Sequence, residues 1–303
     1  MGKRLFLVLI FSLLICSCSA DKTQPTQTTQ HTMNADFLLE GAYFNENPPG
    51  VEPVKFAVGF LNRRYHSSPV FSPDGTNVWW AGAYGSATIY HSEIMEGVWL
   101  EPEIVEFSEE INGYRDPFVS PDGQRLYFIS PSALPGETAS GKENIWVMEK
   151  NGDTWGEPEP LPDVINQYSL HWTISVANNY NLYFAANDRG ESDIYISEYL
   201  NGEYQEPVIL DEIISSDVIE FTPNIAPDES YLLFSRLEDR NSNPYLYITY
   251  ATESGWSAPQ EVENIPYCIS PIITPDRKYV IFMGGPTSIY WRDTSFIEEL
   301  RVE

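Results

Sequence analysis

The sequence is poor in cysteine and in basic residues, and both shortages exclude classes of protein. It has 3 cysteines, and Cys16 and Cys18 lie at the N-terminus, which leaves Cys268 as the single cysteine in the body of the chain. One cysteine cannot form an intrachain disulfide, so packing must hold the fold together. With 17 Lys and Arg residues against 44 Asp and Glu residues, the formal net charge is −27. Such a surface repels phosphate backbones, which argues against nucleic-acid binding and is typical of a highly soluble domain.

The N-terminus predicts export and a lipid anchor. A basic start precedes the apolar run Leu5 to Ile15, which is too short to cross a bilayer as a permanent helix and is typical of a signal sequence. The run ends in Ile15-Cys16-Ser17-Cys18, which resembles the bacterial lipobox. We therefore expect a signal peptide at residues 1–17 and a lipid on Cys18. Cys16 fits less well because the large Ile15 precedes it, and the alternative is an ordinary cleaved secretory peptide.

The residues after the cleavage site predict where the protein is sorted and how it is tethered. Ser19, rather than Asp, follows Cys18; by resemblance to the lipoprotein sorting rule, this implies the outer membrane, with the protein facing the periplasm or the outside. Residues 18–36 lack apolar periodicity and are rich in Thr and Gln, so we expect a flexible tether. A multiply acylated cysteine would hold such a chain stably in the cell envelope.

One phrase recurs along the rest of the chain and organises it. Its clear copies are Ser68–Gly75, Asp116–Gly123, Thr222–Glu229 and Ser270–Asp276, with a degenerate copy at Thr173–Asn179. The second prolines of these copies, with Asn178 standing in once, are separated by 48, 57, 49 and 48 residues. This spacing is typical of a propeller blade of four strands.

Each copy supplies the elements of one blade. The Pro-Asp-Gly segment suits a tight turn, because proline fixes φ and glycine tolerates a positive φ. An apolar strand follows it in every repeat, at Val78–Ala81, Leu126–Ile129, Leu182–Ala185, Leu232–Ser235 and Val280–Met283. A third strand with an Ile-Tyr type phrase comes next. The fourth strand begins near a proline, which suits an outer edge where a missing N–H costs no ladder bond.

The last repeat lacks its fourth strand, and the missing piece stands at the other end of the domain. The segment Val51–Phe60 matches the fourth-strand phrase, and Pro53 precedes Pro73 by 20 residues, as Pro207 precedes Pro227. We therefore predict that this segment completes the last blade and closes the ring, which removes exposed sheet edges. The expected fold is an all-β, five-bladed propeller over residues 37–303, with six blades as the alternative if residues 37–50 add strands.

The Ser-Pro-Asp-Gly turn followed by an aromatic strand and Asp-Ile-Tyr resembles the WD40-like propeller repeat of the TolB type, over roughly residues 50–295. The resemblance implies the fold and leaves the chemistry open, because propellers host binding proteins, hydrolases and lyases.

The first residues of the innermost strands should converge on one mouth of the central channel, which is a natural pocket. Aligning the repeats by their prolines gives three neighbouring columns. The first contains His66, Tyr114, His171, Glu220 and Cys268. The second contains Ser67, Arg115, Trp172, Phe221 and Ile269. The third contains Ser68, Asp116, Thr173, Thr222 and Ser270.

Two interpretations of these columns stay open. His66, His171 and Glu220 are suitable donors for a divalent metal, and Asp116 and Glu220 could serve as acid and base beside Arg115. The aromatic residues Tyr65, Tyr114 and Trp172 could stack on a sugar face. In the other interpretation, the polar groups satisfy one another and bound water, and the aromatics pack the core. Cys268 fits a small buried hydrophobe better than a nucleophile.

No serine-hydrolase elbow, phosphate-binding loop, paired-cysteine motif or His-Glu-x-x-His motif occurs in the sequence. We therefore expect a binding module for a glycan, a peptide or an envelope protein partner at the channel mouth, with no required cofactor. The ligand residues would be Tyr65, His66, Tyr114, Arg115, His171, Trp172 and Glu220. The alternative is a polysaccharide lyase or glycoside hydrolase that uses His66, His171, Glu220, Asp116 and Arg115. A scaffold within an envelope complex, by analogy with TolB, is a third hypothesis.

Overall fold

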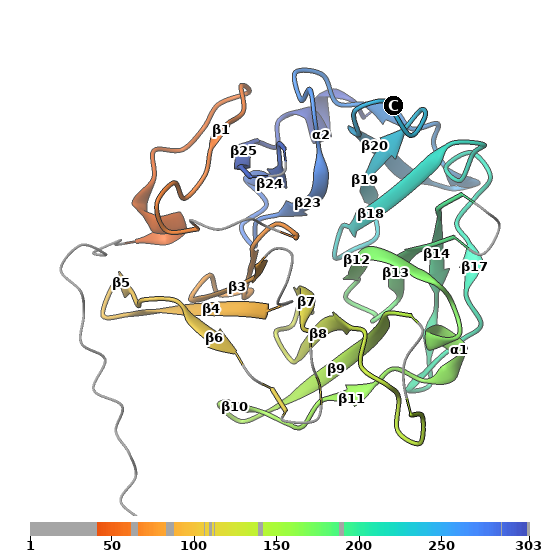
Figure 1. Cartoon of the computed structure of the whole chain (residues 1–303). Coiled ribbons are helices and arrows are strands. Elements are labelled where there is room, and N and C mark those ends of the chain that lie inside the picture. Colours follow the sequence, from red (N-terminus) through yellow and green to blue (C-terminus); the bar gives the residue numbers. More distant parts are fainter. Residues whose placement is uncertain are drawn as a thin grey trace, which may run out of the picture. The chain divides into compact units, whose positions relative to one another are not determined.

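The computed structural model describes residues 41–61, 66–82, 88–105, 107–108, 111, 113–138, 142–187, 191–285 and 287–301, without the side chains of Leu170 and His171. These described residues belong to one compact unit. The predicted signal peptide, Cys18, the tether and Tyr65 lie outside the described residues. Within the described part, antiparallel sheets form a ring of five blades, as predicted (Figure 1).

The strands of each blade run from the innermost to the outermost. Blade 1 contains β2 (Val70–Phe71), β3 (Asn77–Gly82), β4 (Thr88–Met95), β5 (Val98–Trp99) and β6 (Glu103–Val105). Blade 2 contains β7 (Arg115–Val119), β8 (Arg125–Ser130), β9 (Asn144–Asn151), β10 (Thr154–Trp155) and β11 (Glu159–Pro160). Blade 3 contains β12 (Leu170–Val176), β13 (Leu182–Ala186), β14 (Asp193–Ser197) and β17 (Val208–Ile209), beside a hairpin of β15 (Tyr199–Leu200) and β16 (Glu203–Tyr204).

Blade 4 contains β18 (Ile219–Ile225), β19 (Tyr231–Leu237), β20 (Tyr245–Thr252), β21 (Gly255–Trp256) and β22 (Gln260–Glu261). Blade 5 contains β23 (Ile269–Ile273), β24 (Tyr279–Met283), β25 (Ile289–Asp293) and β1 (Val54–Lys55). The helical segments are short: η1 (Ala42–Asn45), α1 (Asp163–Asn166) and α2 (Phe296–Glu299). None of the helices in the described residues has the length and apolar character needed to cross a membrane.

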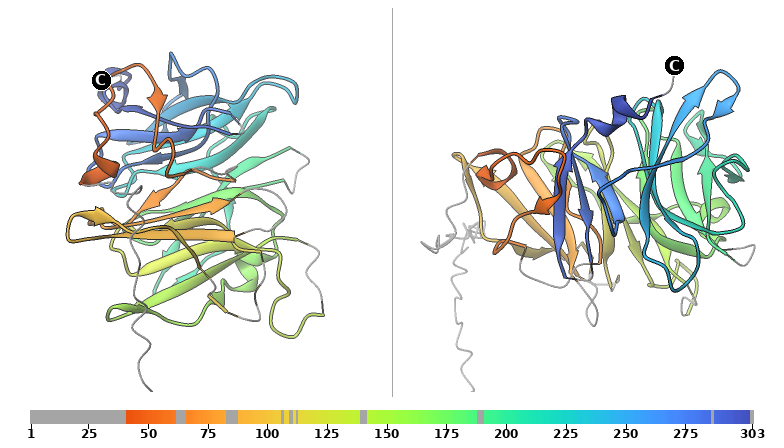
Figure 2. Two further views of the ribbon diagram at one scale, coloured as in Figure 1. Left: turned by 60° about the vertical axis from the view of Figure 1, so that its left-hand side comes forward. Right: turned by 90° about the horizontal axis from the view of Figure 1, so that it is seen from above.

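The N-terminal strand closes the ring, which confirms the prediction from the proline spacing. β1 pairs antiparallel with β25, with Val54 opposite Trp291. Beyond the pair, the Phe56 N–H donates to the Ile289 carbonyl at 2.9 Å. The Phe56 ring is buried, and its centroid lies 4.9 Å from that of Trp291. Two segments far apart in the sequence therefore form one blade, and the views in Figure 2 show them side by side.

The recurring turns form as their residues predict. In the first copy, the Ser72 hydroxyl donates to Asp74 Oδ1 at 2.5 Å, and the Gly75 N–H donates to the Ser72 carbonyl at 2.8 Å. Gly75 has a φ of 70°, which favours glycine. The hydrogen bonds from Ser72 and Thr76 outweigh partial burial and lower the pKa of Asp74. The aspartates of this motif therefore act as turn formers.

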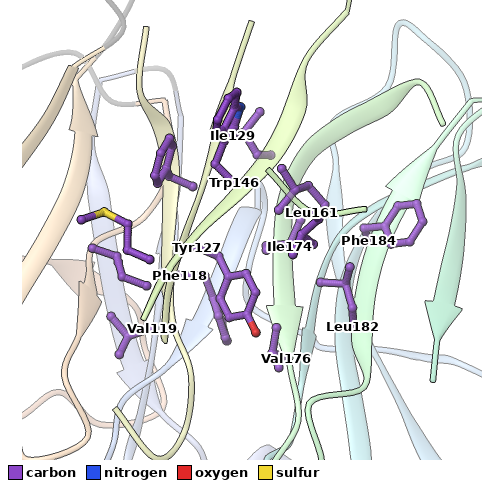
Figure 3. Close-up of a cluster of buried hydrophobic side chains, with 14 of the residues drawn as sticks. Phe118, Val119, Tyr127, Ile129, Trp146, Leu161, Ile174, Val176, Leu182 and Phe184 are labelled. Atoms are coloured by element: carbon purple, nitrogen blue, oxygen red, sulfur yellow. The ribbon is translucent and has the colours of Figure 1, made fainter. Parts of the chain in front are cut away.

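The blades pack face to face through large apolar side chains. Figure 3 shows this core between blades 2 and 3, where Phe118 and Tyr127 from one blade meet Ile174 and Leu182 from the next. Tyr127 and Leu182 are fully buried. Complete burial of one such apolar side chain contributes roughly 1.5–3 kcal/mol, so this core between blades adds substantially to the stability of the ring.

The innermost strands are sheet edges, and side chains of the neighbouring blade satisfy their free N–H groups. The Ser68 N–H donates to Ser270 Oγ at 3.1 Å, and the Ser270 N–H donates to Thr222 Oγ1 at 3.2 Å. One layer further along the axis, the Ile273 N–H donates to Asn224 Oδ1 at 3.1 Å. Buried N–H groups without an acceptor are costly, so these bonds link the blades around the channel.

Candidate functional site

The start of the innermost strand bends sharply in blades 2, 4 and 5, where the sequence predicted the mouth. Asp116, Thr222 and Ser270 have φ values of 47°, 49° and 53°, and each lies at a register shift in its sheet. A left-handed conformation costs a residue other than glycine roughly 1–2 kcal/mol. Because the bend recurs from blade to blade, it belongs to the construction of the ring.

Blade 3 contains one more residue at this bend than the other blades. In blade 3, Leu170 pairs with Ala186. This pair has the same register as the pair of Glu220 and Arg236 in blade 4, so Leu170 is the counterpart of Glu220. His171 therefore lies one position beyond Glu220 and shares the register of Arg115. A shift of one residue changes the face of the sheet to which a position belongs. The proline-based alignment of His171 with His66 and Glu220 thus differs from the register in the structure.

The structure brings His66 and Asp116 together. His66 Nδ1 lies 2.8 Å from Asp116 Oδ1, and the Asp116 side chain is fully buried. Burial alone would lower the pKa of His66, but the charge and hydrogen bond of Asp116 outweigh it and raise this pKa. Arg115 forms an ion pair with Glu143 beside them. Asp116 Oδ2 is buried and has no hydrogen-bond partner among the described residues.

Glu220 belongs to a different cluster. Its carboxylate accepts hydrogen bonds from Arg236 Nε at 3.0 Å and from the Ser216 hydroxyl at 2.7 Å. Burial raises the pKa of Glu220 to about 7, although Ser216 and Arg236 act in the opposite direction. Within the described residues, no group of His, Cys, Asp and Glu side chains is placed to hold a metal ion, and the His171 side chain is not among them. The metal site stays a prediction.

Of the aromatic residues predicted for the site, one lies in the core and one lies at the surface. Tyr114 is buried against Phe107 and Phe128, and its hydroxyl donates to the Ser108 carbonyl at 2.7 Å. Trp172 is partly exposed, and its ring centroid lies 6.4 Å from that of His66. Trp172 therefore offers a surface for a ligand, whereas Tyr114 packs inside. Cys268 is fully buried, and burial raises the pKa of its thiol, so it packs as a small apolar residue.

A pocket of about 270 Å³ opens beside Trp172, between blades 3 and 4. Its lining residues are Trp172, Asn187, Glu191, Ser192, Ile219, Phe221, Leu237 and Arg240. The rings of Trp172 and Phe221 meet edge to face with centroids 5.1 Å apart. Glu191 Oε2 and Arg240 Nη2 form an exposed ion pair at 3.0 Å.

Ser192 is the polar group that the repeat alignment missed. Its side chain is buried in the pocket wall, and its Oγ has no hydrogen-bond partner among the described residues. Ser192 precedes β14 outside the repeated phrase, so only its position before Asp193-Ile194-Tyr195 could have drawn attention to it. A buried hydroxyl without a partner costs roughly 1–3 kcal/mol.

A second cavity, of about 130 Å³, lies at the opposite end of the innermost strands. All five innermost strands contribute to it, through residues such as Val70, Phe118, Val176, Ile225 and Ile272. Its walls are mainly apolar, and the prolines of the repeated turns surround it. In the sequence those prolines mark turns, and no sequence pattern predicts this cavity.

Neither known protein families nor curated proteins match the chain. Among solved structures it is similar to TolB from Acinetobacter baumannii, with 15% identity over 74% of this chain and 53% of that chain and a TM-score of 0.49. A putative TolB from Agrobacterium tumefaciens is 18% identical over 71% of this chain and 68% of that chain, with a TM-score of 0.49. A gluconolactonase from Xanthomonas campestris is 11% identical over 82% of this chain and 95% of that chain, with a TM-score of 0.47. The chain thus spans about half the length of the Acinetobacter TolB. At these identities and TM-scores the neighbours indicate nothing about ligand or chemistry.

Proposed function

We propose that the chain is a cell-envelope binding module whose ligand is a saccharide held in the pocket between blades 3 and 4. One observation supports this most strongly: the partly exposed Trp172 ring and the Phe221 ring form an aromatic wall of this pocket, and the exposed Asn187 lies in its lining. A sugar presents an apolar ring face and a rim of hydroxyls. The pocket offers an aromatic and aliphatic wall together with the exposed Asn187 amide as a hydrogen-bonding group.

The charges around the pocket also favour a neutral ligand. Glu191 and Arg240 balance each other at the rim, while the protein as a whole is strongly acidic. An acidic sugar would meet the repulsion of that overall charge. A neutral saccharide would keep the ion pair intact.

The test is a binding measurement on the purified full chain in detergent. Neutral mono- and oligosaccharides are titrated by calorimetry and by ligand-observed NMR. We expect saturable binding that weakens about tenfold or more in Trp172→Ala, because the stacking surface is lost. Trp256→Ala, in the outer part of blade 4, is the matched control and should leave affinity unchanged. Absence of saturable binding across the neutral panel contradicts the proposal.

We also propose that a lipid on Cys18 anchors the chain to the outer membrane. The proposal rests on the lipobox-like segment Ile15–Cys18 and on Ser19 after it. Cells labelled with an alkyne fatty acid should yield labelled protein that sediments with the outer membrane. Cys18→Ser should abolish both label and sedimentation, while Cys16→Ser should keep them. Label retained in Cys18→Ser contradicts this assignment.

A second candidate function is saccharide cleavage, which the His66–Asp116 contact favours. A carboxylate that orients an imidazole is a common arrangement for a general base. Arg115 lies next to this pair and is partly exposed, which suits a group that holds developing negative charge. The test is product release from a broad polysaccharide panel, by lyase or hydrolase action. The hypothesis fails if the panel yields no product, or if Asp116→Asn leaves any turnover undiminished.

A further inference from the structure

The ring contains a repeated groove at its turn end, which we call the turn groove. Each turn groove lies between the second and third strands of one blade and the Pro-Asp turn of the next. The side chain that projects into the groove belongs to the residue after the aspartate of that turn. In blade 3, Asn179 stands in the place of the aspartate. Around the ring these residues are Gly75, Gly123, Tyr180, Glu229 and Arg277. Two of the grooves thus receive no side chain from their turn.

In the turn groove between blades 2 and 3, an arginine of the chain itself is the occupant. The Arg125 guanidinium carbon lies 4.1 Å from the centroid of the Tyr180 ring and 5.0 Å from that of Tyr199. Arg125 Nη2 lies 3.1 Å from a Glu149 carboxylate oxygen, and it donates to the Tyr199 hydroxyl at 3.0 Å. The groove architecture therefore accepts a guanidinium between aromatic rings and a carboxylate.

Side chains of the chain also occupy other turn grooves. Between blades 3 and 4, Glu229 accepts hydrogen bonds from Asn181 at 2.9 Å and from the Tyr183 hydroxyl at 2.8 Å. Between blades 5 and 1, where the turn supplies only Gly75, Tyr43 from the N-terminal segment lies against Tyr279, with ring centroids 5.8 Å apart. These contacts show that the ring tends to complete its grooves from within.

The turn groove between blades 1 and 2 is open. Asn77 stands where blade 2 has Arg125, and Gly123 stands where blade 3 has Tyr180, so both occupants of the neighbouring groove are missing. A groove of about 470 Å³ remains, with Trp79, His91 and Trp155 among its lining residues. Trp79 stacks on His91 with centroids 4.8 Å apart, and it meets Trp155 edge to face at 6.2 Å.

The open groove is acidic. Four carboxylates and one ammonium group line it: Asp74, Glu93, Asp122, Asp153 and Lys150. Hydrogen bonds to the two carboxylates outweigh partial burial and lower the pKa values of Asp74 and Asp122, so both are ionised at neutral pH. For Asp122 these bonds include one from the Tyr180 hydroxyl of blade 3. Burial lowers the pKa of His91 to about 4, so it adds no positive charge. Lys150 Nζ lies 5.9 Å from the centroid of the Trp155 ring, which shows that a cation can approach that ring.

We propose that the open turn groove between blades 1 and 2 binds an arginine side chain of a partner protein. The guanidinium would displace the Lys150 ammonium from the Trp155 ring and pair with the carboxylates of the groove. Within the chain, Arg125 combines the same two kinds of contact one groove further on, with the rings of Tyr180 and Tyr199 and the carboxylate of Glu149. Arginine suits this site better than lysine, because its planar group stacks on aromatic rings and forms paired hydrogen bonds with carboxylates. The proposal is independent of the saccharide pocket, which lies between other blades.

Short peptides on the intact full chain provide the test. Acetyl-Gly-Arg-Gly-amide is titrated while the Trp155 indole N–H is followed by NMR, with the Lys and Tyr versions of the peptide as comparisons. We expect the Arg peptide to shift the Trp155 signal and to bind more tightly than either comparison. Trp155→Ala should weaken binding at least about fivefold, as lost cation–π and stacking contacts imply. The equivalent Trp256→Ala in blade 4 should leave it unchanged.

A second variant fills the groove from within. Gly123→Tyr places in this groove the side chain that Tyr180 supplies in the next, and the φ values of the two positions, 70° and 65°, are nearly the same. It should abolish binding of the Arg peptide, while Gly202→Tyr, at another glycine of positive φ, should not. If Gly123→Tyr does not fold, Asp153→Asn replaces it as the variant, and it should weaken binding of the Arg peptide because one carboxylate of the groove is lost. The proposal is overturned if no peptide shifts the Trp155 signal, if the Tyr peptide binds best, or if binding survives in folded Gly123→Tyr.

Discussion

Asp116 Oδ1 in β7 lies 2.8 Å from His66 Nδ1 in the segment that leads into β2, so one polar contact joins the innermost strands of blades 1 and 2. The contact lies at the end of the channel where the sequence placed the mouth. Glu220, by contrast, is engaged with Arg236 and Ser216 beside blade 4.

The first prediction concerns the pH dependence of this contact. Because Asp116 raises the pKa of His66, the protonated imidazole stabilises the fold fully below its unfolded pKa of about 6.5, and this contribution is lost as the pH rises through the folded value. Asp116→Asn should therefore lower the pKa of His66 and cost more stability at about pH 5.5 than at about pH 9. Imidazole NMR titration and urea unfolding at both pH values measure this. An unchanged His66 pKa in the variant contradicts it.

The second prediction concerns the buried partner of Glu220. Arg236→Met should destabilise the fold by about 3 kcal/mol or more at about pH 8.5, because a buried carboxylate loses its counter-charge. The pKa of Glu220 in the folded protein, about 7, lies above its ordinary value. As the pH falls through 7, the folded protein therefore takes up a proton at Glu220 that the unfolded chain binds only at lower pH. The cost should consequently shrink at about pH 5, where the carboxyl is neutral.

Arg240→Met is the matched control for Arg236→Met. Arg240 pairs with Glu191 at the surface, where such pairs contribute at most about 1 kcal/mol. Urea unfolding of both variants at both pH values should separate them clearly. Equal costs for the two substitutions would sink the assignment of Glu220 and Arg236 as a buried pair that governs stability.

The third prediction tests closure of the ring. Phe56→Ala should cost about 3–5 kcal/mol, because Phe56 is buried among Phe44, Phe71 and Trp291 and its removal leaves a cavity. Val54→Ala, at an exposed position of β1, should change stability by no more than about 0.5 kcal/mol. Equilibrium unfolding followed by tryptophan fluorescence gives both values. A loss below about 1 kcal/mol for Phe56→Ala would show that the N-terminal segment does not hold the last blade.

The fourth prediction compares two serines in equivalent positions of adjacent blades. Ser270→Ala removes the acceptor of the buried Ser68 N–H and should cost about 1–3 kcal/mol. Ser68→Ala removes an Oγ that has no partner among the described residues, so it should be neutral or slightly stabilising. Amide hydrogen exchange at Ser68 should accelerate in Ser270→Ala alone. Similar costs for the two variants would mean that the inter-blade bond contributes nothing.

The repeat was readable from the sequence because its chemistry is local. Proline, aspartate and glycine at fixed places specify a turn whatever surrounds them, and the distance from Pro53 to Pro73 located the closing strand. The candidate site was less readable. The extra residue in β12 shifts His171 relative to Glu220, and no local pattern marks where a strand takes up an additional residue. Ser192 and the pocket beside Trp172 lie outside the repeated phrase, so an alignment of repeats could not bring them together.

The sequence by itself determined the all-β class, the propeller repeat with five blades as the first expectation, the turns and the closing strand, because each depends on short segments with strong conformational preferences. Only the tertiary structure decided which side chains meet between blades: His66 with Asp116, Glu220 with Arg236, and Arg125 with Tyr180 and Tyr199. Those contacts depend on how neighbouring blades pack and on which turn groove contains a large side chain. That is a property of distant residues in combination, so the pockets and the open groove between blades 1 and 2 became visible only in three dimensions.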